Sequence, residues 1–139
     1  MKPSNILLSA DYKTVKLCDF GLARIKTTVA ATATVGNRQG TPLFMAPEIM
    51  INKKRPNFDT DVWAMGGTIA ELYSCSDFWD LSEAEDYYDF ILKKMKKKNL
   101  PDGFKALKDA NEDVHQKLQD VFAYTPKNRP SAKVLHQRF

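Results

Sequence analysis

The stretch that decides the fold is residues 2–21, which read KPSNILLSADYKTVKLCDFG. Two short apolar runs, residues 6–8 and 15–17, flank a polar segment, and this pattern predicts a β-hairpin with a longer loop. Asn5 precedes the first run, and Asp19 follows the second. Because an antiparallel pair puts the start of one strand beside the end of the other, Asn5 and Asp19 are expected to converge at one end of the hairpin.

This convergence would bring together an amide oxygen and a carboxylate, with the Lys2 ammonium three positions before Asn5. Hard oxygen ligands suit Mg²⁺, and an ammonium group suits the oxygens of a phosphate chain. We therefore interpret the base of the predicted hairpin as part of a phosphoryl-transfer site.

Length and composition indicate one soluble globular domain of 139 residues, with 43% hydrophobic and 27% charged residues. No apolar run reaches the roughly 18 residues of a membrane span, and no signal-peptide core is apparent. Cys18 and Cys75 have neither metal-site nor redox spacing. We expect an intracellular, cytoplasmic location.

The net charge of +4 owes much to a cluster of lysines at positions 93, 94, 96, 97 and 98. Two interpretations are open. The cluster could bind an acidic partner or nucleic acid, or it could be a solvated helix end where cations oppose the helix dipole. The sequence favours the second interpretation because no interleaved aromatic residues or binding motif accompany the lysines.

Residues 59–73 predict a central helix, with Asp59 or Thr60 as its N-cap. Apolar residues cover nearly all its faces, as in a helix buried on most sides. Gly66 and Gly67 each cost about 1 kcal/mol relative to alanine in a helix. We therefore expect a neighbouring backbone segment to approach the helix closely at these glycines.

Further helices are predicted after a capping box at residues 82–85, over residues 111–123, and after Ser131. Phe78 and Trp79 could form an exposed partner site, but we expect them in the core. Residues 22–40 show no clear hydrophobic period, and a loop of this length is usually functional or disordered.

Four motifs follow one another along the chain: Lys2–Asn5, Asp19–Gly21, Ala46–Glu48 and Asp61–Gly66. Their order and spacing resemble the second half of a eukaryotic protein kinase of the serine/threonine type. The resemblance implies a mainly α fold with a small β-hairpin, namely the C-terminal lobe of the α+β protein-kinase fold without its N-terminal lobe.

The resemblance covers essentially the whole chain as a partial kinase domain. It implies a catalytic-loop remnant at residues 1–8 and a magnesium loop at 19–21. An activation and substrate-docking segment would follow at 22–48, and a helical lobe at 49–139. The candidate phosphorylation sites in the activation loop would be Thr27, Thr28, Thr32 and Thr34. The alternative for this loop is a polar surface segment that merely contains threonines.

The resemblance also implies roles for single residues in a complete kinase that uses ATP and Mg²⁺. Asp19 would hold the Mg²⁺ that bridges the phosphates, and Asn5 would hold a second Mg²⁺. Lys2 would stabilise the transferring phosphoryl group, Thr41 would help order the catalytic loop, and Leu7 would touch the adenine side of the cleft.

Five further residues would be structural in the same family. Phe20 and Gly21 would complete the magnesium loop, and Asp61 would brace the backbone of the catalytic loop. Glu48 would pair with Arg129, which stands far down the chain.

A complete kinase also has a glycine-rich loop, a third-strand lysine with its partner glutamate, and a His-Arg-Asp triplet, and this sequence contains none of them. The triplet would immediately precede Met1. We therefore expect a truncated chain that begins at an internal methionine, is inactive alone, and is poorly stable because an apolar face is left uncovered.

ATP and a protein substrate would be the partners of the complete kinase, and neither a membrane nor a nucleic acid is expected. The alternative function is a non-catalytic, kinase-like module that binds partners as a scaffold.

Overall fold

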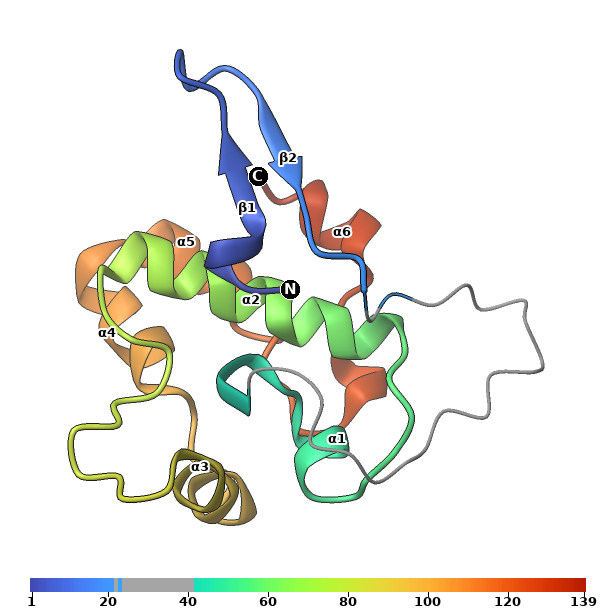
Figure 1. Ribbon diagram of the computed structural model, residues 1–139, viewed down its shortest axis with the longest axis vertical. Helices are drawn as coiled ribbons and strands as arrows, with labels where there is room; N and C mark the ends of the chain where they lie inside the picture. Colours follow the sequence, from blue (N-terminus) through green and yellow to red (C-terminus); the bar gives the residue numbers. More distant parts are fainter. Residues whose placement is uncertain (22, 24–41) are drawn as a thin grey trace.

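A computed structural model describes residues 1–21, 23 and 42–139 of the chain. It consists of a helical body from which one β-hairpin projects (Figure 1). The described residues form two strands, six α-helices and three short 3₁₀ turns, in the following order: Pro3–Asn5 (3₁₀), β1 Ile6–Leu8, β2 Val15–Leu17, Pro42–Phe44 (3₁₀), α1 Pro47–Met50, α2 Phe58–Ser74, α3 Tyr87–Lys96, α4 Asp102–Ala110, α5 Glu112–Leu118, Pro126–Asn128 (3₁₀) and α6 Ala132–His136. The prediction of a mainly α fold with a small β-hairpin is confirmed.

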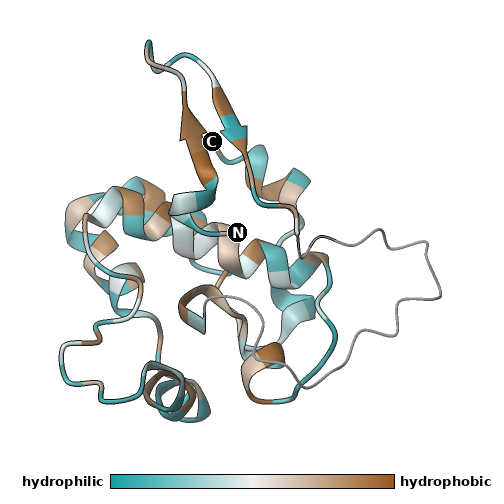
Figure 2. Cartoon of the chain, in the orientation of Figure 1, coloured by the Kyte–Doolittle hydropathy of each residue, from teal (hydrophilic) through white to brown (hydrophobic). Residues whose placement is uncertain are grey.

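The hairpin has the predicted strands. β1 and β2 are antiparallel, and Ile6 pairs with Leu17, Leu7 with Lys16, and Leu8 with Val15. Because alternate residues point to opposite faces of a strand pair, Ile6, Leu8, Val15 and Leu17 share one face. Figure 2 shows the strongly hydrophobic character of β1. Leu8 and Val15 are nevertheless 57% and 61% exposed, so the hairpin carries an uncovered apolar surface.

Helix α2 runs through the middle of the helical body (Figure 1). Trp63, on α2, is fully buried, and its ring meets that of Phe122 edge-on with 5.3 Å between the ring centroids. Phe78 and Trp79 are also buried, so their predicted place in the core is confirmed. The prediction for α2 fails at its C-terminal end, where Leu72 and Tyr73 are 58% and 50% exposed.

The two glycines of α2 are close to other residues, although not to a backbone as we predicted. A Cβ atom on Gly66 would lie 2.3 Å from Val121 Cγ1, and one on Gly67 would lie 2.9 Å from the Phe78 ring. The glycines therefore make room for side chains. A neighbouring backbone does approach at Gly103, where a Cβ atom would lie 2.9 Å from the Asp77 carbonyl oxygen.

Several predicted helix ends are wrong by a few residues. Helix α2 is capped by Asn57, whose side-chain oxygen accepts from the Thr60 N–H at 3.1 Å, while the Thr60 hydroxyl oxygen accepts from the Asn57 N–H at 3.2 Å. Helix α3 is capped by Asp86, so the capping box at residues 82–85 does not begin it. Helix α5 ends at Leu118, and the predicted Ser131 cap of α6 is confirmed.

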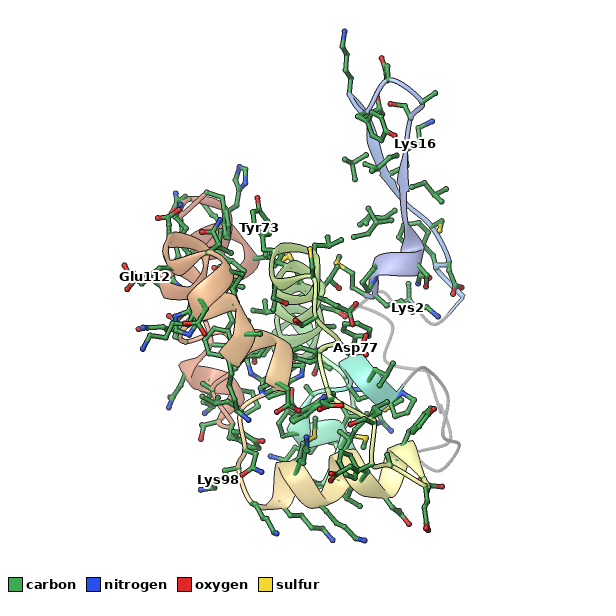
Figure 3. All side chains as sticks on the ribbon, turned by 90° about the vertical axis from the view of Figure 1, so that its left-hand side faces the viewer. Lys2, Lys16, Tyr73, Asp77, Lys98 and Glu112 are labelled. Carbon is green, nitrogen blue, oxygen red and sulfur yellow. The ribbon has the colours of Figure 1, made fainter. Side chains whose placement is uncertain are left out.

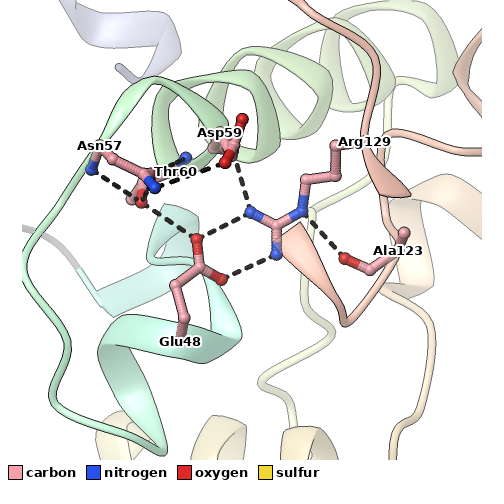
Figure 4. Close-up of polar contacts among 6 residues, drawn as sticks. All are labelled: Glu48, Asn57, Asp59, Thr60, Ala123 and Arg129. Carbon is pink, nitrogen blue, oxygen red and sulfur yellow. Dashed lines mark hydrogen bonds and ion pairs between the residues drawn. The ribbon is translucent and has the colours of Figure 1, made fainter. Parts of the chain in front are cut away.

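Glu48 and Arg129 form a buried ion pair that joins α1 to the segment before α6 (Figure 4). The two guanidinium ends donate to the two carboxylate oxygens at 2.8 and 2.7 Å. Two further N–H groups of Arg129 donate to the carbonyl oxygens of Asp59 and Ala123, each at 2.9 Å. The Thr60 hydroxyl donates to Glu48 at 3.0 Å. The pairing that we predicted is therefore present, with its hydrogen-bonding groups satisfied.

This environment acts in two directions on the Glu48 carboxyl. Burial raises its pKa, whereas hydrogen bonds and the charge of Arg129, together with the Thr60 hydroxyl, lower it, and the net result is a pKa below the ordinary value. Because the pKa is lowered in the folded protein, ionised Glu48 stabilises the fold at pH values above the ordinary pKa of a glutamate. This contribution is lost as the pH falls through the pKa of Glu48 in the folded chain.

Removal of Arg129 tests the importance of the pair. We expect Arg129→Met to lower the free energy of unfolding by about 3–5 kcal/mol, because Glu48 is left as a buried, unpaired charge. Urea denaturation followed by circular dichroism measures the loss. The matched control is Lys117→Met, which breaks the more exposed ion pair with Asp113 and should cost about 1 kcal/mol or less. Equal losses of unfolding free energy in the two variants would contradict the conclusion that the Glu48–Arg129 pair is buried and structurally important.

The packing at Gly66 gives a second prediction. An alanine in mid-helix is normally favoured over glycine by about 1 kcal/mol, but Gly66→Ala should destabilise the chain by about 1–3 kcal/mol because the new methyl group collides with Val121. In a Val121→Ala background the same substitution should be neutral or stabilising. Thermal unfolding of the original chain, the two single variants and the double variant measures these changes in stability. If Gly66→Ala destabilised the chain equally with valine and with alanine at position 121, a collision with Val121 would be contradicted.

Candidate active site at the base of the hairpin

The base of the hairpin brings together the two chain segments that carry the predicted metal ligands. The Cys18 N–H donates to the Asn5 carbonyl oxygen at 2.9 Å, directly beyond the Ile6–Leu17 pair. Asn5 ends a short turn in which its N–H donates to the Lys2 carbonyl oxygen at 3.0 Å. Figure 3 places Lys2 at this end of the hairpin and Lys16 farther along it. The sequence segments that carry Lys2, Asn5 and Asp19 therefore meet.

Asp19 has an unusual backbone conformation. Its φ angle is +61°, in the left-handed region that few non-glycine residues adopt. Aspartate tolerates this region better than most residues, and such conformations gather at functional sites. The Asp19 side chain is exposed, whereas Asn5 is half-buried. A carboxylate is thus held at the edge of the hairpin with access to solvent.

The donor set at this site fits Mg²⁺ bound together with a phosphate. Asn5 and Asp19 offer one amide oxygen and one carboxylate, and no group of three or more metal-binding side chains occurs in the part of the chain that the structure describes. Mg²⁺ typically takes one or two protein carboxylates and completes its octahedron with substrate phosphate oxygens and water. These two donors fit a Mg²⁺ ion that takes its other ligands from phosphate and water, and the metal–nucleotide site stays a prediction.

The other predicted site residues are more scattered. Leu7 is 53% exposed on the face opposite the apolar one, in a pocket that it lines with Leu8, Ser9, Thr14 and Lys16. Phe20 is 66% exposed. Asp61 lies in the first turn of α2 with an exposed side chain that makes no hydrogen bond to another described residue. Its bracing role stays a prediction. Thr41 and the four phosphorylation candidates, Thr27, Thr28, Thr32 and Thr34, lie outside the described residues.

One contributor to the Glu48–Arg129 pair escaped the sequence analysis. The Thr60 hydroxyl donates to Glu48 while the same residue completes the cap of α2 with Asn57. The spacing of an asparagine and a threonine three residues apart carries the capping signal. Nothing in the local sequence indicates the bond to Glu48.

Comparisons with known proteins agree with the geometry. A family model described as "Protein kinase domain" matches residues 1–139. The chain is 34% identical over 140 residues to dual specificity protein kinase shkE of Dictyostelium discoideum, a match that covers 99% of this chain and 18% of that protein. It is 32% identical over 136 residues to mitogen-activated protein kinase kinase kinase 20 of Arabidopsis thaliana, covering 97% of this chain and 38% of that protein.

A third relative, serine/threonine-protein kinase TIO of Arabidopsis thaliana, is 47% identical over 74 residues, which covers 52% of this chain and 5% of that protein. The chain thus spans less than two fifths of the length of each of these relatives. The family model covers every residue, and on that basis the chain belongs to the protein kinase family.

Proposed function

We propose that this chain supplies the metal-binding half of a protein serine/threonine kinase, which transfers the γ-phosphoryl group of ATP to a serine or threonine hydroxyl. The observation that carries the proposal is the bond from the Cys18 N–H to the Asn5 carbonyl, which brings the segments of Asn5 and Asp19 to one end of the hairpin. The serine/threonine class is supported by Lys2, in the Lys-Pro-Ser-Asn form typical of that class, while the relatives include dual specificity and serine/threonine kinases.

Each polar residue of the site has a proposed task. The Asp19 carboxylate and the Asn5 amide oxygen would hold Mg²⁺, which neutralises charge on the phosphate oxygens when it is bound. The Lys2 ammonium would donate charge-assisted hydrogen bonds to an oxygen of the transferring group. Because Asp19 is exposed, its carboxylate is accessible to an ion from solvent.

We propose that the 139 residues alone are catalytically inactive. The sequence contains no His-Arg-Asp triplet, so it lacks the family's aspartate that orients the attacking hydroxyl and accepts its proton. It also lacks the glycine-rich loop that covers the phosphates. We therefore expect this chain to bind a metal–nucleotide complex but not to catalyse phosphoryl transfer.

A second candidate function is a non-catalytic, kinase-like scaffold. The exposed apolar face of the hairpin favours it, because residues such as Leu8 and Val15 would be covered by a bound partner. This function requires neither Asn5 nor Asp19, so metal binding separates the two candidates.

Paramagnetic broadening by Mn²⁺ tests the proposed function. In the presence of ATP, substoichiometric Mn²⁺ should broaden the NMR amide signals around Asn5 and Asp19, and Asp19→Ala should abolish the effect because the sole carboxylate ligand is gone. The matched control is Asp109→Ala, which removes an exposed carboxylate of α4 and should leave the broadening intact. Mn²⁺ broadening that persists in the Asp19→Ala variant would favour the scaffold function.

A phosphotransfer assay with Mg²⁺ and ATP completes the test. We expect no phosphorylation of serine- or threonine-containing peptides by the isolated chain, because the proton acceptor is missing. Transfer that disappears in Asp19→Ala would contradict the proposed inactivity while supporting the kinase chemistry.

A further inference from the structure

The structure divides the lysine cluster of α3 into one structural residue and four exposed residues. Lys94 is partly buried, donates to the Asp102 carboxylate at 2.7 Å, and lies over the Phe90 ring at 4.8 Å. The four remaining lysines are exposed, and none has a carboxylate within 4.0 Å among the described residues. We call these four residues the α3 lysine patch: Lys93, Lys96, Lys97 and Lys98.

Three of the four lysines of the patch lie on one side of the helix. Lys93, Lys96 and Lys97 are spaced i, i+3 and i+4, which aligns them on one face, while Ile91 and Met95 face the core. Like charges at these spacings repel one another. Lys93, Lys94 and Lys96 all lie in the last turn, where the helix dipole favours cations, but the dipole does not require them to share a face.

The surroundings of the patch restrict what could bind it. At about 1.5 Å per residue, Lys93 and Lys96 are only about 5 Å apart along the axis of α3, and Lys97 and Lys98 follow directly after the helix. The helix start carries Asp86 and Asp89, whose carboxylates would repel a polyanion that continued along α3. The exposed aromatic residue that the structure describes in α3 is Tyr87, which lies at this acidic start of the helix and away from the lysine patch. The patch thus lacks the stacking surface and the length that suit a nucleic acid.

We propose that the α3 lysine patch docks a short acidic segment of a protein partner, about three or four carboxylates long. In an extended segment, side chains on one side repeat at about 7 Å, so two of these carboxylates on one side would span roughly the length of the patch. Charge complementarity of this kind speeds association and selects the partner.

The proposed docking site is remote from the hairpin. Figure 1 places α3 at the opposite end of the molecule from β1 and β2, and Figure 3 shows Lys98 far from Lys2. Docking at α3 would therefore leave Asn5 and Asp19 accessible. The proposal goes beyond the kinase function and does not depend on it, because the patch and the metal site share no residue.

Fluorescence anisotropy with a labelled hexapeptide that carries four consecutive glutamates tests the docking site. The variant Lys93→Gln/Lys96→Gln/Lys97→Gln should weaken binding about tenfold or more at low salt, and binding to the unaltered chain should weaken steeply as salt is added. Lys94 is kept in this variant because it is part of the fold. The same peptide with glutamines in place of its glutamates should not bind.

The matched control carries the same loss of charge elsewhere, in Lys13→Gln/Lys127→Gln/Lys133→Gln, at three exposed positions outside the patch. It should change the affinity less than about twofold, and Asp19→Ala should leave peptide binding unchanged. Three results would overturn the proposal: equal losses in the two triple variants, no binding of the glutamate peptide at low salt, or tighter binding of single-stranded DNA through the same lysines. Circular dichroism establishes that each variant is folded.

Discussion

The bidentate ion pair between Glu48 and Arg129 connects the parts of the helical body. It joins α1 to the segment before α6, and the other Arg129 donors hold the carbonyl oxygens of Asp59, at the start of α2, and Ala123. A buried pair is stabilising only when its hydrogen-bonding groups are satisfied. Here Thr60 supplies a further donor to Glu48, and the Arg129 guanidinium lies 5.0 Å from the Trp63 ring. The polar network and the aromatic core are therefore adjacent.

The candidate metal site depends on a different kind of constraint. Its ligands are positioned by the strand pairing of β1 and β2 and by the 3₁₀ turn before β1, all within the first 21 residues. The hairpin projects from the helical body (Figure 1). The proposed metal site and the proposed docking site thus lie in different parts of the molecule, the first in a locally determined hairpin and the second in a body held by long-range contacts.

Sequence reasoning succeeded where structure follows from short-range pattern. The two strands follow from two apolar runs, and the meeting of the segments that carry Asn5 and Asp19 follows from the antiparallel geometry. The Glu48–Arg129 pair spans 81 residues, and only the family resemblance pointed to it. Helix α4 was missed because Gly103 lies in its first turn, and only the structure shows that the Asp77 carbonyl requires glycine there. The start of α2 was misplaced because Asp59 and Thr60 can also cap a helix, and the reciprocal bonds of Thr60 select Asn57.

The central structural claim is that Glu48 is ionised and held by Arg129, even though burial alone would favour its neutral form. A pH titration of the Glu48 carboxyl carbon by ¹³C NMR tests this claim most directly. The account predicts that Glu48 titrates below the ordinary value of 4.5 and stays ionised until acid begins to unfold the chain. A Glu48 carboxyl that titrates at or above 4.5 in the folded chain would show that burial outweighs the pair, and would contradict the account.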